Sequence, residues 1–513
     1  MDAPSAPPVF AARGLRLLLA TALGVVHVAC FAPIGQFYLA PLVFAVLFSL
    51  WRQASSARDA ALIGFGFGLG WFGAGVSWIY VSLHTFGAMP SPLAALATLL
   101  FCAYLALHPA LAGYLSRKVN QAPLTQWILF VPATLTLLEW IRGWLWTGFP
   151  WLNPGYSQVP VSPLAGYAPV TGVHGITLLL LMTAGTLSLL GAETLRRRWR
   201  TFMPWLVLIS AVWAGGAVLK TVAWTESTGS RLNVSLLQGN FAQDLKWRDD
   251  QLRATFATYS ELVHSSRAQL IVLPETALPL FLNDVPVRYL DVLAGHAQRQ
   301  GGDLLLGVPE RTSDGRYYNS VVSIGQSERQ YYRKNHLVPF GEFIPLRPLL
   351  GVVVSMLSIP LQDFSRGDPG QRPLQVAGEA VAVNICYEDT FGEEIIRQLP
   401  EASLLVNVSN VAWFGRSMAP RQHLQIAQMR ALETGRYMLR ATNTGMTAVI
   451  DPRGHIQAEA PEFTRSVLTH TVSGMRGATP YVRWGNTAAL ALAVLLLVTA
   501  LVAGRNHPAR CAG

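Results

Sequence analysis

Charged side chains are scarce in this sequence. Asp, Glu, Lys and Arg together make up only 13% of the 513 residues, about half of the roughly 25% that is usual in a soluble domain. Hydrophobic residues make up 51%, and the mean hydropathy is +0.33. This composition argues against an ordinary soluble enzyme and indicates a membrane protein.

Cysteines are also few, and they are scattered along the chain at positions 30, 102, 386 and 511. They cannot form the disulfide framework of a small secreted domain, and no pair has the spacing of a zinc site. With no nucleotide motif either, we expect no metal and no other cofactor. The net charge of +10 does not indicate nucleic acid, because much of it lies in short loops between apolar runs.

Those apolar runs are long, seven before Glu226 and one after Trp484. A helix of about 20 residues crosses the roughly 30 Å of membrane hydrocarbon. The second run is short and the fifth contains Pro132, so one of these two is an alternative candidate for a re-entrant segment. We expect about eight transmembrane helices, at about 14–32, 37–51, 60–83, 92–115, 124–141, 169–191, 203–221 and 486–504.

The basic residues of the connections predict the orientation of these spans. The first and third connections contain no Lys or Arg, whereas positive charge is typical of cytoplasmic loops. We therefore expect both termini inside the cell and residues from about 222 to 485 outside it. The basic residues precede the first span or follow the second, fourth, sixth and eighth: Arg13, Arg16, Arg52, Arg58, Arg117, Lys118, Arg196, Arg197, Arg198, Arg200, Arg505 and Arg510.

The connection from Arg142 to Tyr156 is dense in aromatic residues, and its Gly and Pro residues exclude a long regular helix. It is either an ordinary interfacial aromatic belt or the wall of a pocket for an acyl chain or a head group. Glu139 and Arg142, three residues apart on one helical face, are expected to pair.

The pattern of hydrophobic residues in the sequence changes from Arg231 onward. Short apolar runs of strand length alternate with helical segments at 249–265 and 422–434, which predicts an α/β domain of roughly 250 residues. We expect a membrane domain at 1–225, a catalytic domain at 226–480, and a last transmembrane helix with a tail at 481–513. The predicted strands lie at 233–237, 270–273, 303–307, 320–324, 381–385 and 403–407.

Reactive polar residues follow three of the predicted strands or strand edges: Glu275, Lys334 and Cys386. A thiol needs a base, and a carboxylate in a desolvated pocket can serve as one. A lysine ammonium favours the thiolate and stabilises an oxyanion, for which the backbone N–H of Tyr387 is a second donor. Taken singly, the residues have plainer explanations: a structural cysteine, a helix cap for Glu275, and a surface charge for Lys334. Glu342 also has a plainer explanation, which is that it only forms an ion pair with Lys334.

In this order and in these contexts, the three residues resemble the Glu-Lys-Cys triad of the nitrilase, or carbon–nitrogen hydrolase, superfamily. That resemblance implies an αββα sandwich for about 230–475. With its membrane spans, nearly the whole chain is similar to the apolipoprotein N-acyltransferase family. The stretches that carry the similarity are 143–156, 237–247, 273–276, 334–345, 407–415 and 422–433.

The resemblance implies an enzyme of the bacterial inner membrane with its catalytic domain in the periplasm. Cys386 would take the sn-1 acyl chain of a phospholipid, typically phosphatidylethanolamine, as a thioester. It would pass the chain to the N-terminal amine of diacylglyceryl-cysteine in an apolipoprotein. Glu275 would be the general base and Lys334 the oxyanion partner. The supporting residues would be Glu342, Glu388, Tyr387, Trp247 and Trp413.

The apolar segment Val352–Leu361 is either a buried helix or strand or, as we expect, a lid that dips into the membrane and admits lipid. Three other functions compete with acyl transfer. A membrane-tethered amide or nitrile hydrolase would pass through the same thioester, with water as the acceptor. A transporter would need ionisable residues inside the helix bundle, and an inactive lipoprotein-binding domain would not need a complete triad.

Overall fold

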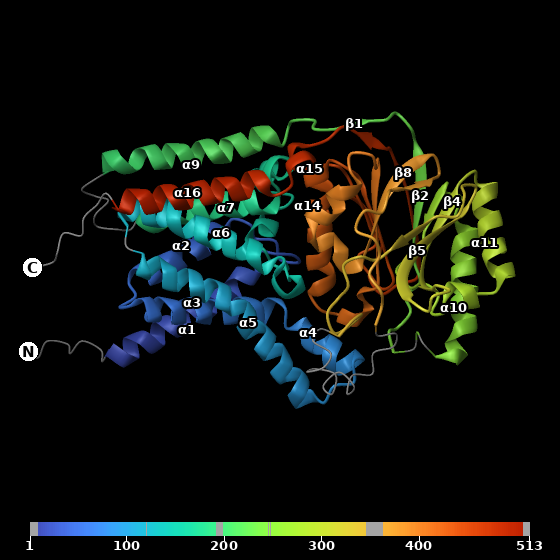
Figure 1. Cartoon of the computed structure of the whole chain (residues 1–513), viewed down its shortest axis with the longest axis horizontal. Coiled ribbons are helices and arrows are strands. Elements are labelled where there is room, and N and C mark those ends of the chain that lie inside the picture. The colour runs from blue at the N-terminus through green and yellow to red at the C-terminus, as the bar shows by residue number, and fades with distance from the viewer. Residues whose placement is uncertain are drawn as a thin grey trace, which may run out of the picture. The chain divides into compact units, whose positions relative to one another are not determined.

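The computed structural model describes residues 9–119, 121–190, 199–244, 246, 248–344 and 363–505. The chain divides into two compact units (Figure 1). The helical unit comprises Met1–Ser77, Ala95–Thr221 and Asn486–Gly513, and the α/β unit comprises Trp78–Ala94 and Val222–Gly485. The domain boundaries at 225 and 480 stay a prediction.

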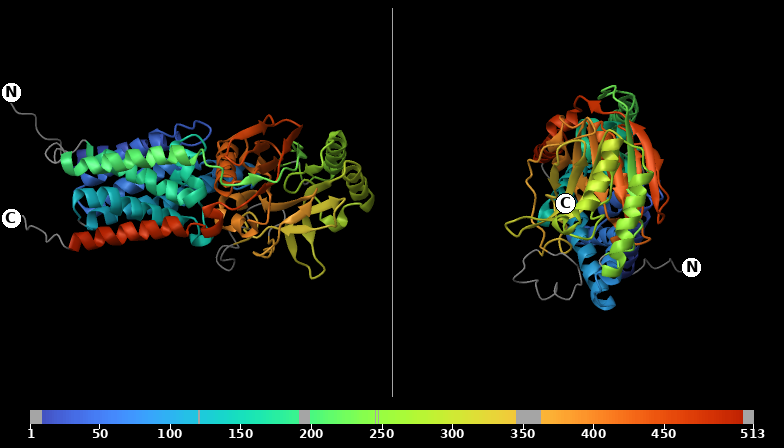
Figure 2. Two further views of the ribbon diagram at one scale, coloured as in Figure 1. Left: turned by 90° about the horizontal axis from the view of Figure 1, so that it is seen from above. Right: turned by 90° about the vertical axis from the view of Figure 1, so that its right-hand side faces the viewer.

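Helices cover all eight segments that the sequence predicted as spans, and most of those in the helical unit have roughly aligned axes (Figure 2), whereas α5 is inclined to them (Figure 1). In chain order they are α1 (Val9–Val28), α2 (Leu39–Arg52), α3 (Ala57–Gly75), α5 (Ser91–Lys118), η2 (Thr125–Phe130) with α6 (Val131–Arg142), α7 (Ala168–Leu190), α9 (Trp199–Leu219) and α16 (Thr487–Arg505).

The expected count of eight spans is not confirmed. Among the described residues, four helices are long and apolar enough to cross a membrane, at Ser91–Lys118, Pro163–Leu190, Phe202–Leu219 and Thr487–Gly504. A fifth candidate, Ala57–Gly75 with Trp78–Phe86, bends by 50° at the break. Of the remaining helices, α2 and α6 have only 14 and 12 residues, fewer than the roughly 20 that cross the hydrocarbon of a membrane.

Glycine lets two helices of the helical unit approach closely. A Cβ added at Gly70 of α3 would lie 2.0 Å from the backbone oxygen of Thr21 in α1, and one added at Gly24 of α1 would lie 2.0 Å from that of Phe67. Close approach through small residues is how helices associate without a hydrophobic driving force in lipid.

The predicted pairing of Glu139 with Arg142 in α6 is confirmed, since Arg142 Nε donates to Glu139 Oε1 at 3.1 Å.

The described part of the α/β unit contains two sheets of six strands. The first sheet has the order β13 (Ser466–Val472), β2 (Leu232–Gln238), β3 (Leu270–Val272), β4 (Asp303–Arg311), β5 (Tyr317–Gly325) and β6 (Tyr331–Arg333). The second has the order β12 (Ile456–Glu459), β11 (Ala448–Ile450), β10 (Met438–Thr442), β9 (Leu404–Ser409), β8 (Glu379–Ile385) and β7 (Leu374–Val376). All six predicted strands are present.

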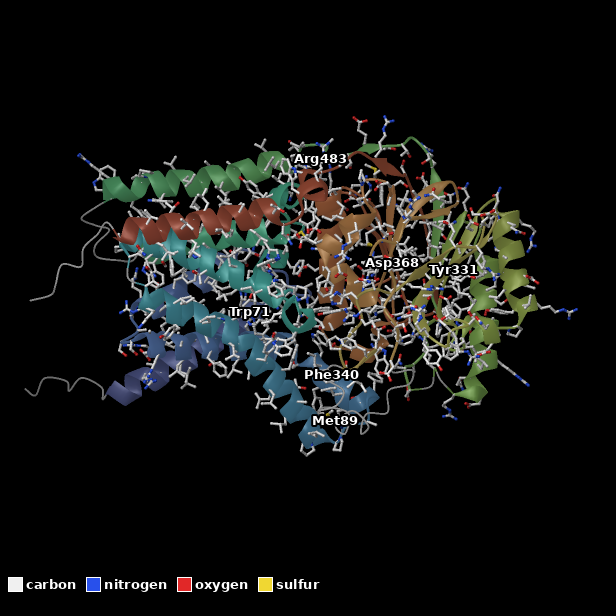
Figure 3. All side chains as sticks on the ribbon, in the orientation of Figure 1. Trp71, Met89, Tyr331, Phe340, Asp368 and Arg483 are labelled. Carbon is white, nitrogen blue, oxygen red and sulfur yellow. The ribbon has the colours of Figure 1, made fainter. Side chains whose placement is uncertain are left out.

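The two sheets pack face to face, and helices cover their outer faces, which confirms the αββα order. Side chains of both sheets fill the space between them (Figure 3), among them Leu236, Val321, Val383 and Val406. Helices α10 (Asp249–Ser265) and α11 (Val287–Arg299) pack on the first sheet. Helix α14 (Ala419–Thr434) packs on the second. Because both faces of the central strands are covered, buried apolar residues occupy both faces of these strands rather than alternating with exposed polar ones.

This topology brings distant parts of the chain together. Strands β2, β3 and β4 run parallel in one sheet, and β8, β9 and β10 run parallel in the other. The carboxyl ends of parallel strands meet at one edge of their sheet. Glu275 follows β3, and Cys386 follows β8 directly. The segments expected to carry chemistry therefore lie at strand ends.

Candidate active site

Glu275 is a buried carboxylate with a full set of partners. Its Oε1 accepts a hydrogen bond from Asn319 Nδ2 at 2.7 Å, and its Oε2 accepts one from the backbone N–H of Asn410 at 2.8 Å. Burial alone raises the pKa of a carboxyl group, but the Lys334 ammonium and these hydrogen bonds outweigh it and leave the pKa of Glu275 below its usual value. Glu275 is therefore ionised at neutral pH and caps no helix.

Lys334 follows β6 and is only 1% exposed, so it is not a surface charge. Its Nζ lies 2.9 Å from Glu342 Oε1 and 3.5 Å from Glu275 Oε1. Burial lowers the pKa of an ammonium, but the carboxylates of Glu342 and Glu275 outweigh it and raise the pKa of Lys334 above its usual value. The side chain is thus a permanent cation held between two acids.

Cys386 opens the 3-10 turn η7 (Cys386–Thr390) with φ +55°. A residue other than glycine in this left-handed region costs on the order of 1–3 kcal/mol, and such strain is common at functional sites. The strand therefore turns sharply at the thiol instead of continuing past it. A structural cysteine packed inside a strand would need no such turn.

Glu275, Lys334 and Cys386 lie close enough for their charges to interact. Burial first, and then the carboxylate of Glu275, raise the pKa of the Cys386 thiol, while the Lys334 ammonium acts in the opposite direction. The net effect is a pKa above the usual range, so the resting group is a neutral thiol. The Lys334 ammonium does favour the thiolate, as expected, and Arg440 acts in the same direction, but burial and the carboxylates of Glu275 and Glu342 outweigh these two cations.

Glu342 does form an ion pair with Lys334, as the plainer explanation predicted, and it also accepts other hydrogen bonds. Its Oε2 accepts the backbone N–H of Val338 at 2.8 Å, which closes the loop after Lys334. Asn319 Nδ2 donates to Glu342 Oε1 at 2.9 Å as well as to Glu275. The two acids are therefore joined through one amide and one ammonium. Nothing in the sequence around Asn319, in the middle of an apolar strand, indicated this link.

Glu388 ties the turn at Cys386 to the loop at Lys334. Its Oε2 accepts from the Ile385 backbone N–H at 2.7 Å and from the Tyr332 hydroxyl at 3.0 Å. Its Oε1 accepts from the backbone N–H groups of Asn335 at 2.7 Å and His336 at 3.0 Å. Burial raises the pKa of Glu388 to about 7 despite these donors.

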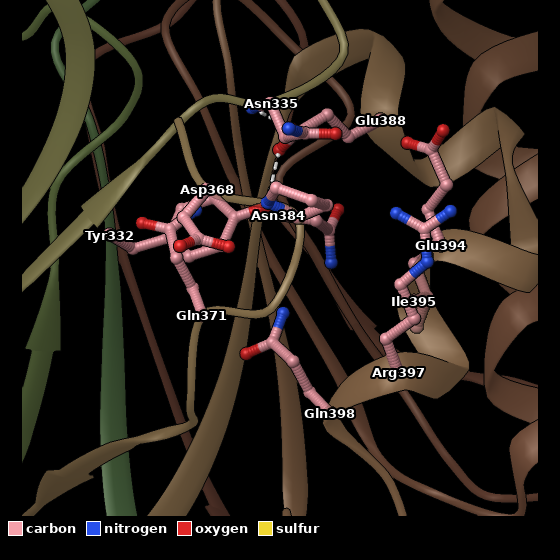
Figure 4. Close-up of a pocket in the computed structure, with 11 residues that line it drawn as sticks. Tyr332, Asn335, Asp368, Gln371, Asn384, Glu388, Glu394, Ile395, Arg397 and Gln398 are labelled. Carbon is pink, nitrogen blue, oxygen red and sulfur yellow. Dashed lines mark hydrogen bonds between the residues drawn. The ribbon is translucent and has the colours of Figure 1, made fainter. Parts of the chain in front are cut away.

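The cavity beside Glu388 is not a lipid site. Its volume is about 20 Å³, room for about one water molecule. It is lined by Tyr332, Asn384, Glu388 and Gln398, among others (Figure 4). An acyl chain needs a far larger space, so this cavity has no part in binding one.

The structure describes two of the remaining predicted site residues, Tyr387 and Trp413. Tyr387 is buried, and its ring packs edge-to-face on Phe391 with the centroids 5.2 Å apart. Trp413 lies in the 3-10 turn η9 (Val411–Phe414) after β9, where Phe86 packs on its ring and Ser82 donates to its backbone oxygen at 2.8 Å. Trp247 and the lid segment Val352–Leu361 lie outside the described residues.

Lys246 is a charged residue near the site that the sequence analysis did not single out. It is 4% exposed, and its Nζ donates to the backbone oxygen of Glu275 at 3.4 Å. Burial lowers its pKa to about 8, although the Glu275 carboxylate acts to raise it. Its position beside Trp247 in the stretch 237–247 was the only available signal.

Two facing sheets with helices on their outer faces are the arrangement expected of a carbon–nitrogen hydrolase, and the comparison with protein families gives the same class. The model of the carbon-nitrogen hydrolase family matches residues 233–481. A crystal structure of the carbon-nitrogen hydrolase from Helicobacter pylori G27 is 16% identical, covers 54% of this chain and 95% of its own, and aligns with a TM-score of 0.35.

A second family model, the apolipoprotein N-acyltransferase N-terminal domain, matches residues 23–186. The apolipoprotein N-acyltransferase of Nitrosomonas europaea is 54% identical over 95% of this chain and 97% of its own length. That of Chromobacterium violaceum is 46% identical over 98% and 96%. The chain belongs to the apolipoprotein N-acyltransferase family. It is a membrane-bound acyltransferase of lipoprotein biosynthesis, with a lipid donor and a lipoprotein acceptor.

Proposed function

We propose that this chain transfers the sn-1 acyl chain of a phospholipid, typically phosphatidylethanolamine, to the N-terminal amine of diacylglyceryl-cysteine in apolipoproteins. The transfer is a ping-pong reaction through a thioester on Cys386, and it completes lipoprotein maturation. One arrangement carries the proposal: a strained cysteine whose thiol pKa responds to a buried carboxylate and a buried ammonium that themselves lie 3.5 Å apart. The same chain carries apolar helices that suit acyl-anchored substrates.

In the first half-reaction the Cys386 sulfur attacks the ester carbonyl carbon while Glu275 takes the thiol proton. This order follows from the raised pKa of the thiol and the ionised state of Glu275. The Lys334 ammonium stabilises the oxyanion, with the Tyr387 backbone N–H as a second donor. The carbon–oxygen bond then breaks, and the proton passes from Glu275 to the departing lysophospholipid oxygen.

In the second half-reaction the neutral α-amine of the lipoprotein attacks the thioester carbon, and Glu275 takes the proton that the new amide nitrogen loses. The carbon–sulfur bond breaks, and the sulfur regains a proton from Glu275. Glu342 and Glu388 act in support, because they hold the lysine loop and the cysteine turn in place. Of the two tryptophans that the family resemblance implies as supporting residues, Trp413 lies in the turn after β9.

The proposed setting is the bacterial inner membrane, crossed eight times. The basic connections place both termini in the cytoplasm and the catalytic residues on the periplasmic side. Both substrates are acyl-anchored in the outer leaflet, so a site on that side reaches them without moving either across the membrane. A membrane-tethered hydrolase with water as the acceptor is the alternative for the same thioester.

Mass spectrometry of the purified full chain tests the proposal. Incubation with phosphatidylethanolamine carrying different acyl chains at sn-1 and sn-2 should add the sn-1 chain to Cys386. A diacylglyceryl-cysteine peptide should then remove it and gain an amide. Cys386→Ala should form no adduct and Cys386→Ser should transfer little, whereas Cys102→Ala, which alters a buried thiol of the helical unit, should behave as wild type.

Three results would contradict this assignment. An adduct on another residue would overturn the site, and an adduct carrying the sn-2 chain would overturn the donor position. Release of free fatty acid at the same rate with and without the peptide would favour the hydrolase.

A further inference from the structure

The backbone at the candidate nucleophile needs an external constraint. Cys386 has φ +55° and lies at the junction of β8 and the turn η7. A residue holds this disfavoured conformation only where its surroundings determine it. The direction of the sulfur depends on this peptide, so whatever fixes the peptide also sets the line of attack.

The neighbouring strand β9 supplies the first contact. Asn407 Nδ2 donates to the backbone oxygen of Cys386 at 3.2 Å and to Asn384 Oδ1 at 2.6 Å. Its other end, Oδ1, accepts from the Ser409 hydroxyl at 2.6 Å and from Arg440 Nη1 at 2.6 Å. Asn407 is fully buried, so it can hold the Cys386 carbonyl only with its amide in this one orientation.

Arg440 on β10 determines that orientation. A guanidinium has only donors and stays protonated in proteins, so the atom it faces must be an acceptor. Turning the Asn407 amide over would place its N–H groups against the guanidinium and its oxygen against the Cys386 carbonyl. Both contacts would be repulsive. A neutral side chain at position 440 could accept as well as donate, or do neither, and would not impose this choice.

The same nitrogen of Arg440 also reaches the turn that carries the cysteine. Arg440 Nη1 donates to Asp389 Oδ2 at 2.8 Å, and Asp389 Oδ1 lies 2.6 Å from His423 Nε2 on α14. Asp389 is three residues after Cys386 in η7. Arg440 therefore connects the strand that holds the Cys386 carbonyl with the turn that follows it.

Stability alone does not explain a charged pair at this place. Arg440 and Asp389 have no exposed surface, and burying an ion pair is seldom more stabilising than packing apolar residues of the same volume. Among the described residues, Nε and Nη2 of Arg440 make no hydrogen bond. The guanidinium is therefore present for the two bonds of Nη1, which flank the cysteine.

We propose that Arg440 is a positioning residue for acyl transfer. It fixes the Asn407 amide and the Asp389 carboxylate, and through them it holds the Cys386 peptide in its left-handed conformation with the sulfur aimed at the ester carbon. The inference rests on the proposed function in taking Cys386 as the nucleophile. Arg440 itself touches no substrate.

The test compares Arg440→Met and Arg440→Lys with the wild type in single-turnover loading of Cys386 by phosphatidylethanolamine, followed by mass spectrometry. Misplacement of a reacting group by about 1 Å costs roughly 100-fold. We expect Arg440→Met to load at least about 100-fold more slowly at saturating lipid, with KM changed by less than about threefold. Arg440→Lys should load within about tenfold of wild type, because an ammonium is also a donor-only cation.

Arg436→Lys is the matched control. Arg436 is equally buried, but it donates to the backbone oxygens of Ala402 and Gly477, away from the cysteine. We expect a lower Tm and an unchanged loading rate per folded molecule. If Arg440→Met does not fold, the comparison of Arg440→Lys with Arg436→Lys decides, and only the former should load more slowly.

Loading of Arg440→Met at the wild-type rate would overturn the inference, as would equal slowing in Arg440→Lys and Arg436→Lys or no advantage of Lys over a folded Met variant. Absence of an adduct in the wild type would instead contradict the proposed function itself. The two failures are therefore distinguishable in one experiment.

Discussion

The resting state of the candidate site is decided by a few neighbouring charges. Glu275 and Lys334 are ionised, and the Cys386 thiol is neutral because burial and the Glu275 carboxylate raise its pKa. A neutral thiol is a poor nucleophile toward electrophiles that arrive by chance. In the proposed mechanism, reactivity is gained only when a bound ester lets the proton move to Glu275, which would confine the chemistry to the substrate complex.

At this scale, Glu275→Gln should separate the reactivity of the thiol from catalysis. Removing a negative charge beside Cys386 lowers the thiol pKa, so alkylation by iodoacetamide should begin at a lower pH and be faster at pH 7 than in the wild type. Acyl loading should fall by about 10³-fold or more, because no base remains. The pH profile of alkylation and the single-turnover loading rate measure the two effects.

Glu261→Gln, a change at an exposed acid on α10, is the control and should alter neither quantity. If the alkylation profile of Glu275→Gln moved to higher pH, the electrostatic description of the site would be wrong. Retention of loading in that variant would remove Glu275 from the role of base.

At the scale of the elements, the turn η7 and the loop after β6 are held together by one carboxylate. Glu388 accepts from Ile385 at the end of β8 and from Asn335 and His336 after Lys334. Two segments from different sheets therefore share a buried acid. A shift of either segment alone would break hydrogen bonds to this buried carboxylate, so the turn and the loop are expected to move together.

The sign of the pKa shift at Glu388 makes this link dependent on pH. Its pKa is about 7 in the folded chain against an ordinary value of 4.5, so the folded state binds more protons between these pH values. Stability should therefore fall as the pH rises from about 4.5 to about 7. Glu388→Gln cannot titrate, and its Tm should depend less steeply on pH over that window than the Tm of the wild type.

Glu433 titrates with the same sign, since burial raises its pKa to about 8. It should account for part of the slope that remains in Glu388→Gln, and Glu433→Gln is the matched comparison. Parallel curves of Tm against pH for wild type and Glu388→Gln would contradict the assigned shift.

At the scale of the whole molecule, the distribution of basic residues predicts which side of the membrane each part of the chain faces. In a background with Cys386→Ala and Cys511→Ser, Ser313→Cys in the α/β unit should react with a membrane-impermeant maleimide added to spheroplasts. Arg58→Cys in the second connection should not react until the membrane is opened. Both positions are exposed, so their reactivity should depend on the side of the membrane rather than on burial.

A permeant maleimide should label both variants and thereby show that each thiol is accessible. Labelling of Arg58→Cys in intact spheroplasts would reverse the predicted orientation. Equal labelling of both variants from outside would contradict the number of crossings between positions 58 and 313.

The sequence by itself determined the elements whose signal is local. Strands such as 233–237 and 381–385 are short runs made mostly of apolar residues, and helix 249–265 has the expected bounds. The pairing of Glu139 with Arg142 follows from helix geometry alone. The resemblance of the strand-end residues Glu275, Lys334 and Cys386 to a known triad also gave the class of enzyme, because those residues stand in recognisable contexts along the chain.

Only the tertiary structure decided how these residues are held and in which protonation state. Asn319, Arg440 and Lys246 come from separate parts of the chain, and their roles arise from atoms brought within hydrogen-bonding distance by two sheets packing together. The sequence led us to expect that Lys334 favours the thiolate, and it does act in that direction, but burial and two carboxylates outweigh it and leave a thiol. A pKa depends on every charge and on the solvent around a group in space, and the order of residues along a chain does not contain that arrangement.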